Sequence, residues 1–293
     1  MSGNEWLTER FEASRPHLRA VAYRMLGSLG EAEDAVQESW LRLNMVDTSG
    51  VENLEGWLTT VVARVCLDML RSRKARGEEL LSANPAETVP DGKHVTNPEQ
   101  ETLLAESVGL ALLVVLERLA PRERLAFVLH DVFAMPFEEI APIVGRTPAA
   151  ARQLASRARR RVQGRSTISN TDLSRQRKVV DDFLTALRER DFDGLLAVLA
   201  PDVVRRADQV AVPSDDAREL RGAEAVAEEV LTHADRVRFA QLALVNGSVG
   251  IVLAPRGRLT TVIQCTVKGG KIVEMEVIAD PARLREIDLA VVK

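Results

Sequence analysis

The pattern of apolar and polar positions divides the chain into three blocks. Residues 4–76 and 98–163 place their apolar side chains at the spacing of amphipathic helices. The third block, 172–293, opens with one helical segment and continues in alternating, strand-like segments. Polar segments rich in breakers and small residues separate the blocks at 77–97 and 164–171. We therefore expect two all-α domains, joined by a linker, and then an α+β domain.

Apolar stripes predict the helices of the first two blocks. In the segment 31–44 the apolar side comprises Ala32, Ala35, Val36, Ser39, Trp40 and Leu43. In the segment 54–71 it comprises Trp57, Leu58, Val61, Val65 and Met69. We expect both tryptophans to lie in the core and residues 45–52 to form a loop. In the second block, Asn97 and Pro98 suit the start of a long helix that runs to about Leu119.

Residues 121–162 carry the pattern of a helix-turn-helix. Two helices are predicted, over 122–133 and 136–144, followed by a turn at Gly145–Arg146. A third helix begins after Thr147, because Pro148 suits a first helical position. This arrangement is typical of domains that place their last helix in the major groove of DNA.

Basic residues concentrate on that last helix. Seven arginines and no acidic residue lie between Arg146 and Arg165. We expect Ala150, Leu154, Ala158 and Val162 to face the domain body. The side chains expected to face away or flank that surface are Arg152, Gln153, Ser156, Arg157, Arg159 and Arg160. Arginine can bind guanine or phosphate and glutamine can bind adenine, so the pattern favours a DNA-binding helix over a merely solvated basic face.

A second basic cluster ends the first block. It comprises Arg64, Arg71, Arg73, Lys74 and Arg76, with Asp68 as its acidic member. Alone it would be a weak sign of nucleic-acid binding. Together with the basic helix of the second block, it suggests that one chain contacts DNA at two well-separated places.

Composition limits the other functions. The net charge is −4, so DNA binding must depend on local basic patches. Cys66 and Cys265 show no pairing pattern and are expected to be reduced and buried, and no metal site or cofactor is expected. The N-terminus lacks the features of a signal peptide, and the longest apolar stretch, Val108–Leu116, is about half of a membrane span. We therefore expect a cytoplasmic protein.

Residues 6–162 resemble the extracytoplasmic-function group of RNA polymerase sigma factors, which keep sigma domains 2 and 4. The resemblance rests on Ala22–Arg42 (AYRMLGSLGEAEDAVQESWLR) and on Ala149–Val162, which is similar to the helix that binds the −35 promoter element. It implies two partners, core RNA polymerase and promoter DNA. It assigns polymerase binding to Asp34, Gln37 and Glu38. It assigns the −10 element to residues 45–52 and the start of the Trp57 helix, and −35 contacts to Arg152, Gln153, Ser156 and Arg157.

The third block resembles the SnoaL-like members of the nuclear-transport-factor-2 superfamily, in which one curved sheet wraps around helices. Its order is a helix over 175–190, a strand over 203–212, a helix after Gly222, and strands near 237–245, 249–253, 259–267 and 272–278. Asn246–Gly247 and Gly269–Gly270 are hairpin signals. Sigma factors with such an extension form a class of the sigma J type. The resemblance implies a built-in regulator that contacts the sigma domains within the chain.

The match to that class is incomplete. Asp280–Leu284 (DPARL) is an altered form of its terminal N-P-D-K-L motif, and its linker motif W-L-P-E-P is absent, with LLSANPAETVP in that place. Asp215–Arg218 (DDAR) stands where the class has a D-G-G-G turn. The contact between the extension and the sigma domains can therefore differ from that of the best-known subgroup.

Two other functions remain open at this point. A one-component regulator would sense a ligand through the third block and bind an operator without polymerase. A SnoaL-type enzyme would need a general base, for which Asp181, Asp182, Asp208 and His233 are the candidates. Nothing in the sequence pairs these four residues, and we expect each to lie on the surface. We therefore expect a non-enzymatic initiation factor.

Overall fold

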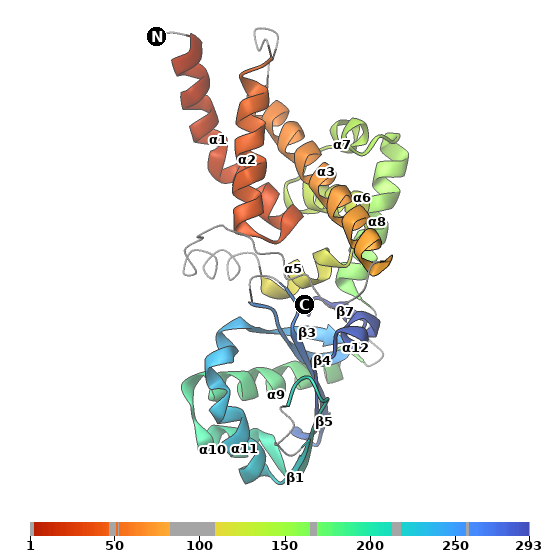
Figure 1. Cartoon of the computed structure of the whole chain (residues 1–293). Coiled ribbons are helices and arrows are strands. Elements are labelled where there is room, and N and C mark those ends of the chain that lie inside the picture. Colours follow the sequence, from red (N-terminus) through yellow and green to blue (C-terminus); the bar gives the residue numbers. More distant parts are fainter. Residues whose placement is uncertain are drawn as a thin grey trace. The chain divides into compact units, whose positions relative to one another are not determined.

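The computed structural model describes residues 3–46, 51, 53–82, 109–164, 169–212, 218–255 and 258–292. They form two compact units. The helical unit comprises Met1–Leu104 with Leu116–Arg159, and the sheet unit comprises Ala105–Val115 with Arg160–Lys293. The boundary passes within two helices, so the second predicted domain contributes residues to both units. Figure 1 shows the helical unit in red to green and the sheet, in teal to blue, in the other unit.

Three helices form the first part of the helical unit: α1 (Gly3–Leu26), α2 (Leu29–Leu43) and α3 (Leu54–Ser82). Ser28 caps α2 by accepting a hydrogen bond from the backbone N–H of Glu31. The predicted apolar side of α2 is buried except for Trp40, which is half-buried and packs on Phe11 with ring centroids 4.8 Å apart. Helix α3 continues to Ser82, so the segment predicted as a linker from residue 77 begins as helix.

The helix-turn-helix is confirmed. Helix α6 (Pro121–Phe127) continues as the π-helix η1 (Val128–Val132) and is followed by α7 (Phe137–Val144) and α8 (Pro148–Gln163). Gly145 ends α7 with φ +65°, a left-handed conformation that costs glycine little. The Thr147 hydroxyl accepts from the backbone N–H of Ala150 and caps α8.

The buried face of α8 differs from the prediction. Its buried residues are Ala151, Ala155, Ala158 and Val162, whereas Ala150 and Leu154 are half-buried. Successive steps of four residues drift around a helix, because each step turns about 400° rather than 360°. The observed steps of four, three and four keep to one side and pack closely on the domain body.

The long helix predicted from Pro98 is also corrected. Helix α5 is Leu110–Glu117, and Gly109 before it has φ +79°, which interrupts a right-handed helix. Residues 83–108 lie outside the described part of the chain. Asn97, Pro98 and most of the predicted linker therefore receive no structural account.

The sheet unit contains, among its described residues, a seven-stranded sheet in the order β2-β1-β6-β5-β4-β3-β7. The strands are β1 (Leu199–Ala207), β2 (Glu219–Arg221), β3 (Ala240–Val245), β4 (Ser248–Leu253), β5 (Thr261–Lys268), β6 (Lys271–Ile278) and β7 (Leu289–Ala290). Both predicted hairpin turns occur, with positive φ at Asn246–Gly247 and Gly269–Gly270. Strand β1 pairs with β6 in parallel, which the sequence did not predict, and the other described pairs are antiparallel.

Helices cover this sheet and complete its core. They are α9 (Asn170–Glu189), α10 (Phe192–Val198), α11 (Ala223–Thr232), the 3-10 helix η2 (Ala234–Phe239) and α12 (Pro281–Glu286). The predicted stripe of α9, Phe183, Leu184 and Leu187, is buried in the core cluster together with Cys265. The α+β architecture expected for a SnoaL-like domain is thus confirmed. Both cysteines are free and buried, as predicted.

Candidate polymerase, nucleic-acid and interdomain sites

The outer face of α8 is the candidate DNA-binding surface. Arg152, Gln153, Ser156, Arg157 and Arg160 are all exposed, as the sequence predicted. The Arg152 guanidinium lies 5.2 Å from the centroid of the Phe137 ring, a cation–π contact that orients the side chain at the start of the helix. A rigid scaffold therefore presents this row, because the opposite face of α8 is packed tightly.

Arg159 is the exception on this helix. It was expected to face away from the body, but it forms an ion pair with Asp131 of η1 at 2.6 Å. The hydrogen bond to Asp131 raises the pKa of Arg159. The guanidinium charge is therefore paired with a carboxylate of the same domain. This pairing corrects the expectation that Arg159 faces away from the domain body.

The candidate polymerase-binding residues lie on one side of α2. Asp34 and Gln37 are exposed, and Glu38 is half-buried and forms an ion pair with Arg42 at 2.9 Å. Asp34 and Glu38 line an open groove whose other wall includes Asp68 and other residues of α3. The groove is lined by four acidic residues and by two arginines, Arg42 and Arg73, so its net charge is negative.

The second basic cluster is described only in part. Arg64 and Arg71 are exposed on α3, and Arg71 forms a surface ion pair with Asp68 at 3.4 Å. Arg73 forms an ion pair with Glu31 of α2, which ties the two helices together. The side chains of Lys74 and Arg76 lie outside the described residues.

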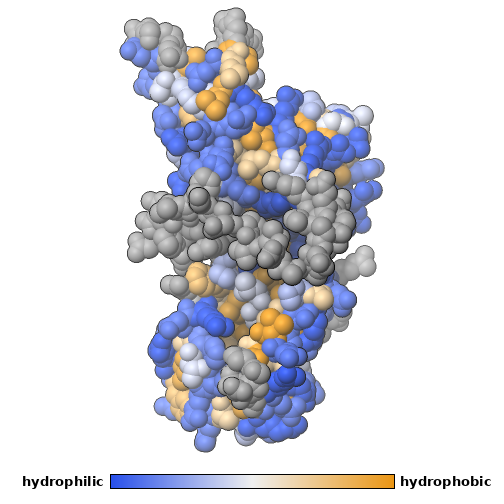
Figure 2. Space-filling model, viewed as in Figure 1, coloured by the Kyte–Doolittle hydropathy of each residue, from blue (hydrophilic) through white to orange (hydrophobic). Residues whose placement is uncertain are grey.

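The candidate −10 region is described only in part, since residues 47–50 and residue 52 lie outside the description. Next to them, Leu41, Met45 and Val46 are exposed apolar side chains, and Met45 is 82% exposed. Trp40 packs against Phe11, and Trp57 is half-buried. Figure 2 shows a mainly hydrophilic visible face of the helical unit with apolar residues between the polar ones. Exposed apolar side chains of this kind suit contact with a partner.

Within the helical unit, helices of the two predicted sigma domains contact each other, which the sequence did not reveal. Arg124 of α6 is 2% exposed and donates from Nε to the carbonyl oxygen of Arg24 at 3.1 Å. Burial lowers the pKa of Arg124 to about 10. Phe133 lies 5.1 Å from the His17 ring and 5.3 Å from the Arg24 guanidinium. Arginine is usually exposed, so no sequence signal marked Arg124 as buried.

Within the sheet unit, the end of α8 is fixed to the last strand. We call this the α8–β7 contact; it comprises Val162, Gly164, Ala290 and Val291. The backbone N–H of Val291 donates to the carbonyl of Val162 at 2.8 Å. Nearby, the Gln241 side chain on β3 accepts from the backbone N–H of Ala111 in α5, at 3.0 Å. No sequence pattern indicated these contacts, because Gly164 lies in a segment that has the composition of a small, polar linker.

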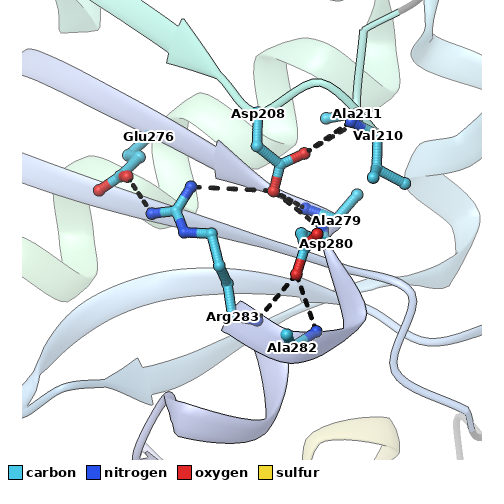
Figure 3. A network of polar contacts seen from close by, with 8 residues as sticks. All are labelled: Asp208, Val210, Ala211, Glu276, Ala279, Asp280, Ala282 and Arg283. Atoms are coloured by element: carbon cyan, nitrogen blue, oxygen red, sulfur yellow. Dashed lines mark hydrogen bonds and ion pairs between the residues drawn. The ribbon is translucent and has the colours of Figure 1, made fainter.

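Asp208, one of the four candidate bases, is not a surface residue as expected. Its side chain is 9% exposed and accepts from four backbone N–H groups, those of Val210, Ala211, Ala279 and Asp280 (Figure 3). Burial alone would raise the pKa of Asp208, but these hydrogen bonds outweigh it and lower the pKa below its ordinary value. Asp208 therefore fixes the end of β6 to the segment after β1.

The other three candidates are exposed, as predicted. Asp181 and Asp182 lie on the outer face of α9, where Asp182 forms an ion pair with Lys178. His233 follows α11, and its Nδ1 lies 2.8 Å from the hydroxyl of Thr232. Among the described residues, no hydrogen bond or ion pair joins any two of the four.

The motif around Asp280 serves the same region. Asp280 caps α12 by accepting from the N–H groups of Ala282 and Arg283. Arg283 forms ion pairs with Glu276 and Asp208, and these contacts are drawn in Figure 3. The altered terminal motif thus connects α12 to the end of β6. Residues 213–217, which include most of the expected turn, lie outside the described residues.

Comparison with known families identifies the class of protein. Residues 10–76 match the model of sigma-70 region 2, and residues 109–162 match that of sigma-70 region 4. Helices α1–α3 and the helix-turn-helix coincide with these two regions. The fold and the exposed faces therefore define a two-region sigma architecture with an additional α+β domain.

Comparison with individual proteins specifies the family. The ECF RNA polymerase sigma factor SigJ of Mycobacterium tuberculosis H37Rv is 39% identical, covering 92% of this chain and 91% of that protein. The probable ECF sigma factor SigI of the same strain is 32% identical, with 97% of each covered. The crystal structure of M. tuberculosis SigJ gives 34% identity and a TM-score of 0.46, covering 94% of this chain and 98% of that one. The chain belongs to the extracytoplasmic-function sigma factors.

These matches also decide between the alternatives. The relatives named above are sigma factors, and this chain aligns with them over nearly their whole length, which supports initiation and not a one-component regulator. Among the residues that the structure describes, no helix combines the length and hydropathy that a bilayer crossing requires.

Proposed function

We propose that the chain binds core RNA polymerase and directs initiation at specific promoters, acting by binding rather than by catalysis. The observation that carries this proposal is that α8 has one buried face and one exposed, basic face. Its alanine face is packed, while Arg152, Gln153 and Arg157 are exposed on the side that a helix-turn-helix presents to the major groove. In this proposal these residues, with Ser156 and Arg160, contact the −35 element, and Arg64 and Arg71 contribute to binding near the −10 element.

The proposal requires the helical unit to open. Elements at −10 and −35 lie about 25 base pairs apart, roughly 85 Å along a duplex with a rise of about 3.4 Å per base pair. The contact of Arg124 with the Arg24 carbonyl joins the two sigma domains directly. Both domains cannot occupy their elements while that contact persists. Polymerase binding would then supply the free energy that separates the two domains.

We propose further that the sheet unit modulates activity through α5 and the end of α8. The backbone bond between Val291 and Val162 and the bond between Ala111 and Gln241 support this role. Both link the sheet directly to helices of sigma region 4. A change in the sheet unit would therefore alter the support of the helix proposed to bind DNA.

Binding of core polymerase provides the test of the acidic groove. Replacing Asp34 by Lys reverses an exposed charge and should weaken the affinity for core polymerase at least about tenfold, or about 1.4 kcal/mol. Asp181→Lys is the matched control, because Asp181 is also an exposed aspartate on a helix. The affinities are measured by competition with labelled protein. Equal affinities for the two variants would show that Asp34 does not contact the polymerase.

A further inference from the structure

The sheet unit contains a cavity of about 440 Å³ that the proposed function does not use. Protein interiors are close-packed and contain few voids larger than a water molecule, whereas small-molecule sites usually enclose about 300–1,000 Å³. We propose that this cavity binds a small, uncharged, mainly apolar molecule that carries one hydrogen-bonding oxygen. The claim concerns binding alone, so it stands or fails independently of transcription.

The lining explains the apolar part of this ligand. Helix α9, η2 and the strands β4 and β6 contribute apolar side chains that include Leu184, Leu187, Val237, Ile251, Met275 and Val277. A ligand with a compact ring system would bury its apolar surface against them, at about 25 cal/mol per Å² removed from water. A strongly polar ligand would lose its hydration without finding enough partners on these walls.

The polar part of the wall explains why the ligand should be uncharged. Arg205 of β1 has a side chain only 2% exposed, and its Nη2 lies 2.6 Å from Oε1 of Glu229 on α11. Both residues line the cavity. The pair is neutral as a whole, so a charged ligand would add an uncompensated charge beside it at a large desolvation cost. A carbonyl or hydroxyl oxygen can instead bond to the edge of the pair.

The same geometry argues for binding rather than turnover. Asp208, the buried carboxylate of this unit, is bonded to four backbone N–H groups and does not line the cavity. His233 and Arg236 line it but are exposed, so water surrounds their polar groups. Glu229 is the carboxylate in the described lining, and its ion pair with Arg205 engages it, so the lining favours binding over general-base catalysis.

Strand β3 connects the cavity to the region that holds α5 and α8. Ala240 lines the cavity, Gln241 bonds to Ala111, and Leu244 pairs with Ala290 in β7. A ligand that moves β3 would therefore disturb both the bond between Gln241 and Ala111 and the pairing of Leu244 with Ala290. This regulatory consequence rests on the proposed function, whereas the binding site does not.

The test uses the full chain and an uncharged naphthalene ketone, 6-propionyl-2-(dimethylamino)naphthalene, whose emission moves to shorter wavelength in apolar surroundings. We expect saturable binding at one site. Ala207→Phe fills part of the cavity and should weaken binding at least about tenfold, or about 1.4 kcal/mol. Ala223→Phe is the control, because Ala223 is likewise half-buried in this unit but does not line the cavity; it should change affinity less than twofold.

A second variant tests the polar wall. Replacing Arg205 and Glu229 together by Met removes both charges at once and leaves neither unpaired. This variant should lose the preference of the native chain for the ketone over the matching propyl compound without the carbonyl. If Ala207→Phe does not fold, Leu253→Trp fills the same cavity instead. Absence of saturable binding, or equal affinity in the filled variants and the control, would overturn the proposal whatever the transcription result.

Discussion

Gly164 lies directly against Ala290: a Cβ on Gly164 would come within 2.3 Å of the Ala290 Cβ. Gly164 also has φ +60°, a conformation that side chains rarely adopt. The end of the proposed DNA-binding helix is therefore fitted to the last strand of the sheet unit, and only glycine fits between them. A bond between backbone groups, from Val291 to Val162, continues the same contact.

Gly164→Ala should loosen this contact. The left-handed conformation costs alanine about 1–2 kcal/mol, and the clash with Ala290 adds to that cost. Gly269→Ala is the control, since Gly269 has φ +58° with nothing within 4 Å of its added Cβ. We expect a larger fall in melting temperature for Gly164→Ala, partly restored by Ala290→Gly, together with a change in transcription that the control lacks. Equal effects of the two single variants would contradict a role for the α8–β7 contact.

Arg152→Ala should weaken recognition of the −35 element by about 1–3 kcal/mol. The residue is exposed on α8 and oriented by Phe137. Arg175→Ala, at an exposed arginine of α9, provides the control. The measurement compares initiation by polymerase holoenzyme on promoters with single changes in the −35 element. An unaltered promoter preference in Arg152→Ala would show that this residue makes no base contact.

Asp208→Asn should destabilise the sheet unit at neutral pH by about 1–3 kcal/mol, because an amide NH₂ would face backbone donors that now bond to a carboxylate. The folded pKa of Asp208 lies below its ordinary value of 3.8. Its stabilisation is therefore complete above that value and is lost as the pH falls through the lower folded pKa.

The difference in unfolding free energy between native chain and Asp208→Asn should accordingly narrow below about pH 4. Denaturant titrations at a series of pH values measure it, with exposed Asp181→Asn as the control. A difference that stays constant to low pH would mean that the charge of Asp208 does not stabilise its hydrogen bonds to the segments after β1 and β6.

Both cysteines should be unreactive in the folded chain. Burial raises the pKa of Cys66 and of Cys265 to about 12, so both remain protonated thiols at pH 8. We expect Ellman's reagent to label neither thiol in the native protein and both after unfolding in guanidinium chloride. Rapid labelling of either thiol under native conditions would show that its part of the core opens readily.

Local patterns predicted much of the helical unit. Pro148 and Gly145 located the helix-turn-helix, because their backbone preferences act within a few residues. The buried side of α8 was harder, since alanines stand on both sides of its first turns and hydrophobicity does not distinguish Ala150 from Ala151. Both cysteines were placed correctly in the core, whereas Trp40 and Trp57, which were also expected there, are only half-buried.

The missed features depend on residues far apart in sequence. Asp208 is buried because donors some 70 positions later, at Ala279 and Asp280, converge on it. The parallel pairing of β1 with β6 and the short strand β7 likewise arise from tertiary contacts. Arg124 is buried because α6 packs against α3, which no local pattern records. For the candidate site, exposure of the α8 row was predictable, whereas the contacts of Val162 and Gly164 with the last strand were not.

Run-off transcription with core RNA polymerase on genomic DNA fragments tests the central claim most directly. The account predicts that the chain, complete or truncated after residue 165, directs initiation from defined start sites that core polymerase alone does not use. It also predicts weak binding to the same duplexes without polymerase. Initiation from no fragment with either form, together with tight and sequence-specific DNA binding without polymerase, would contradict it.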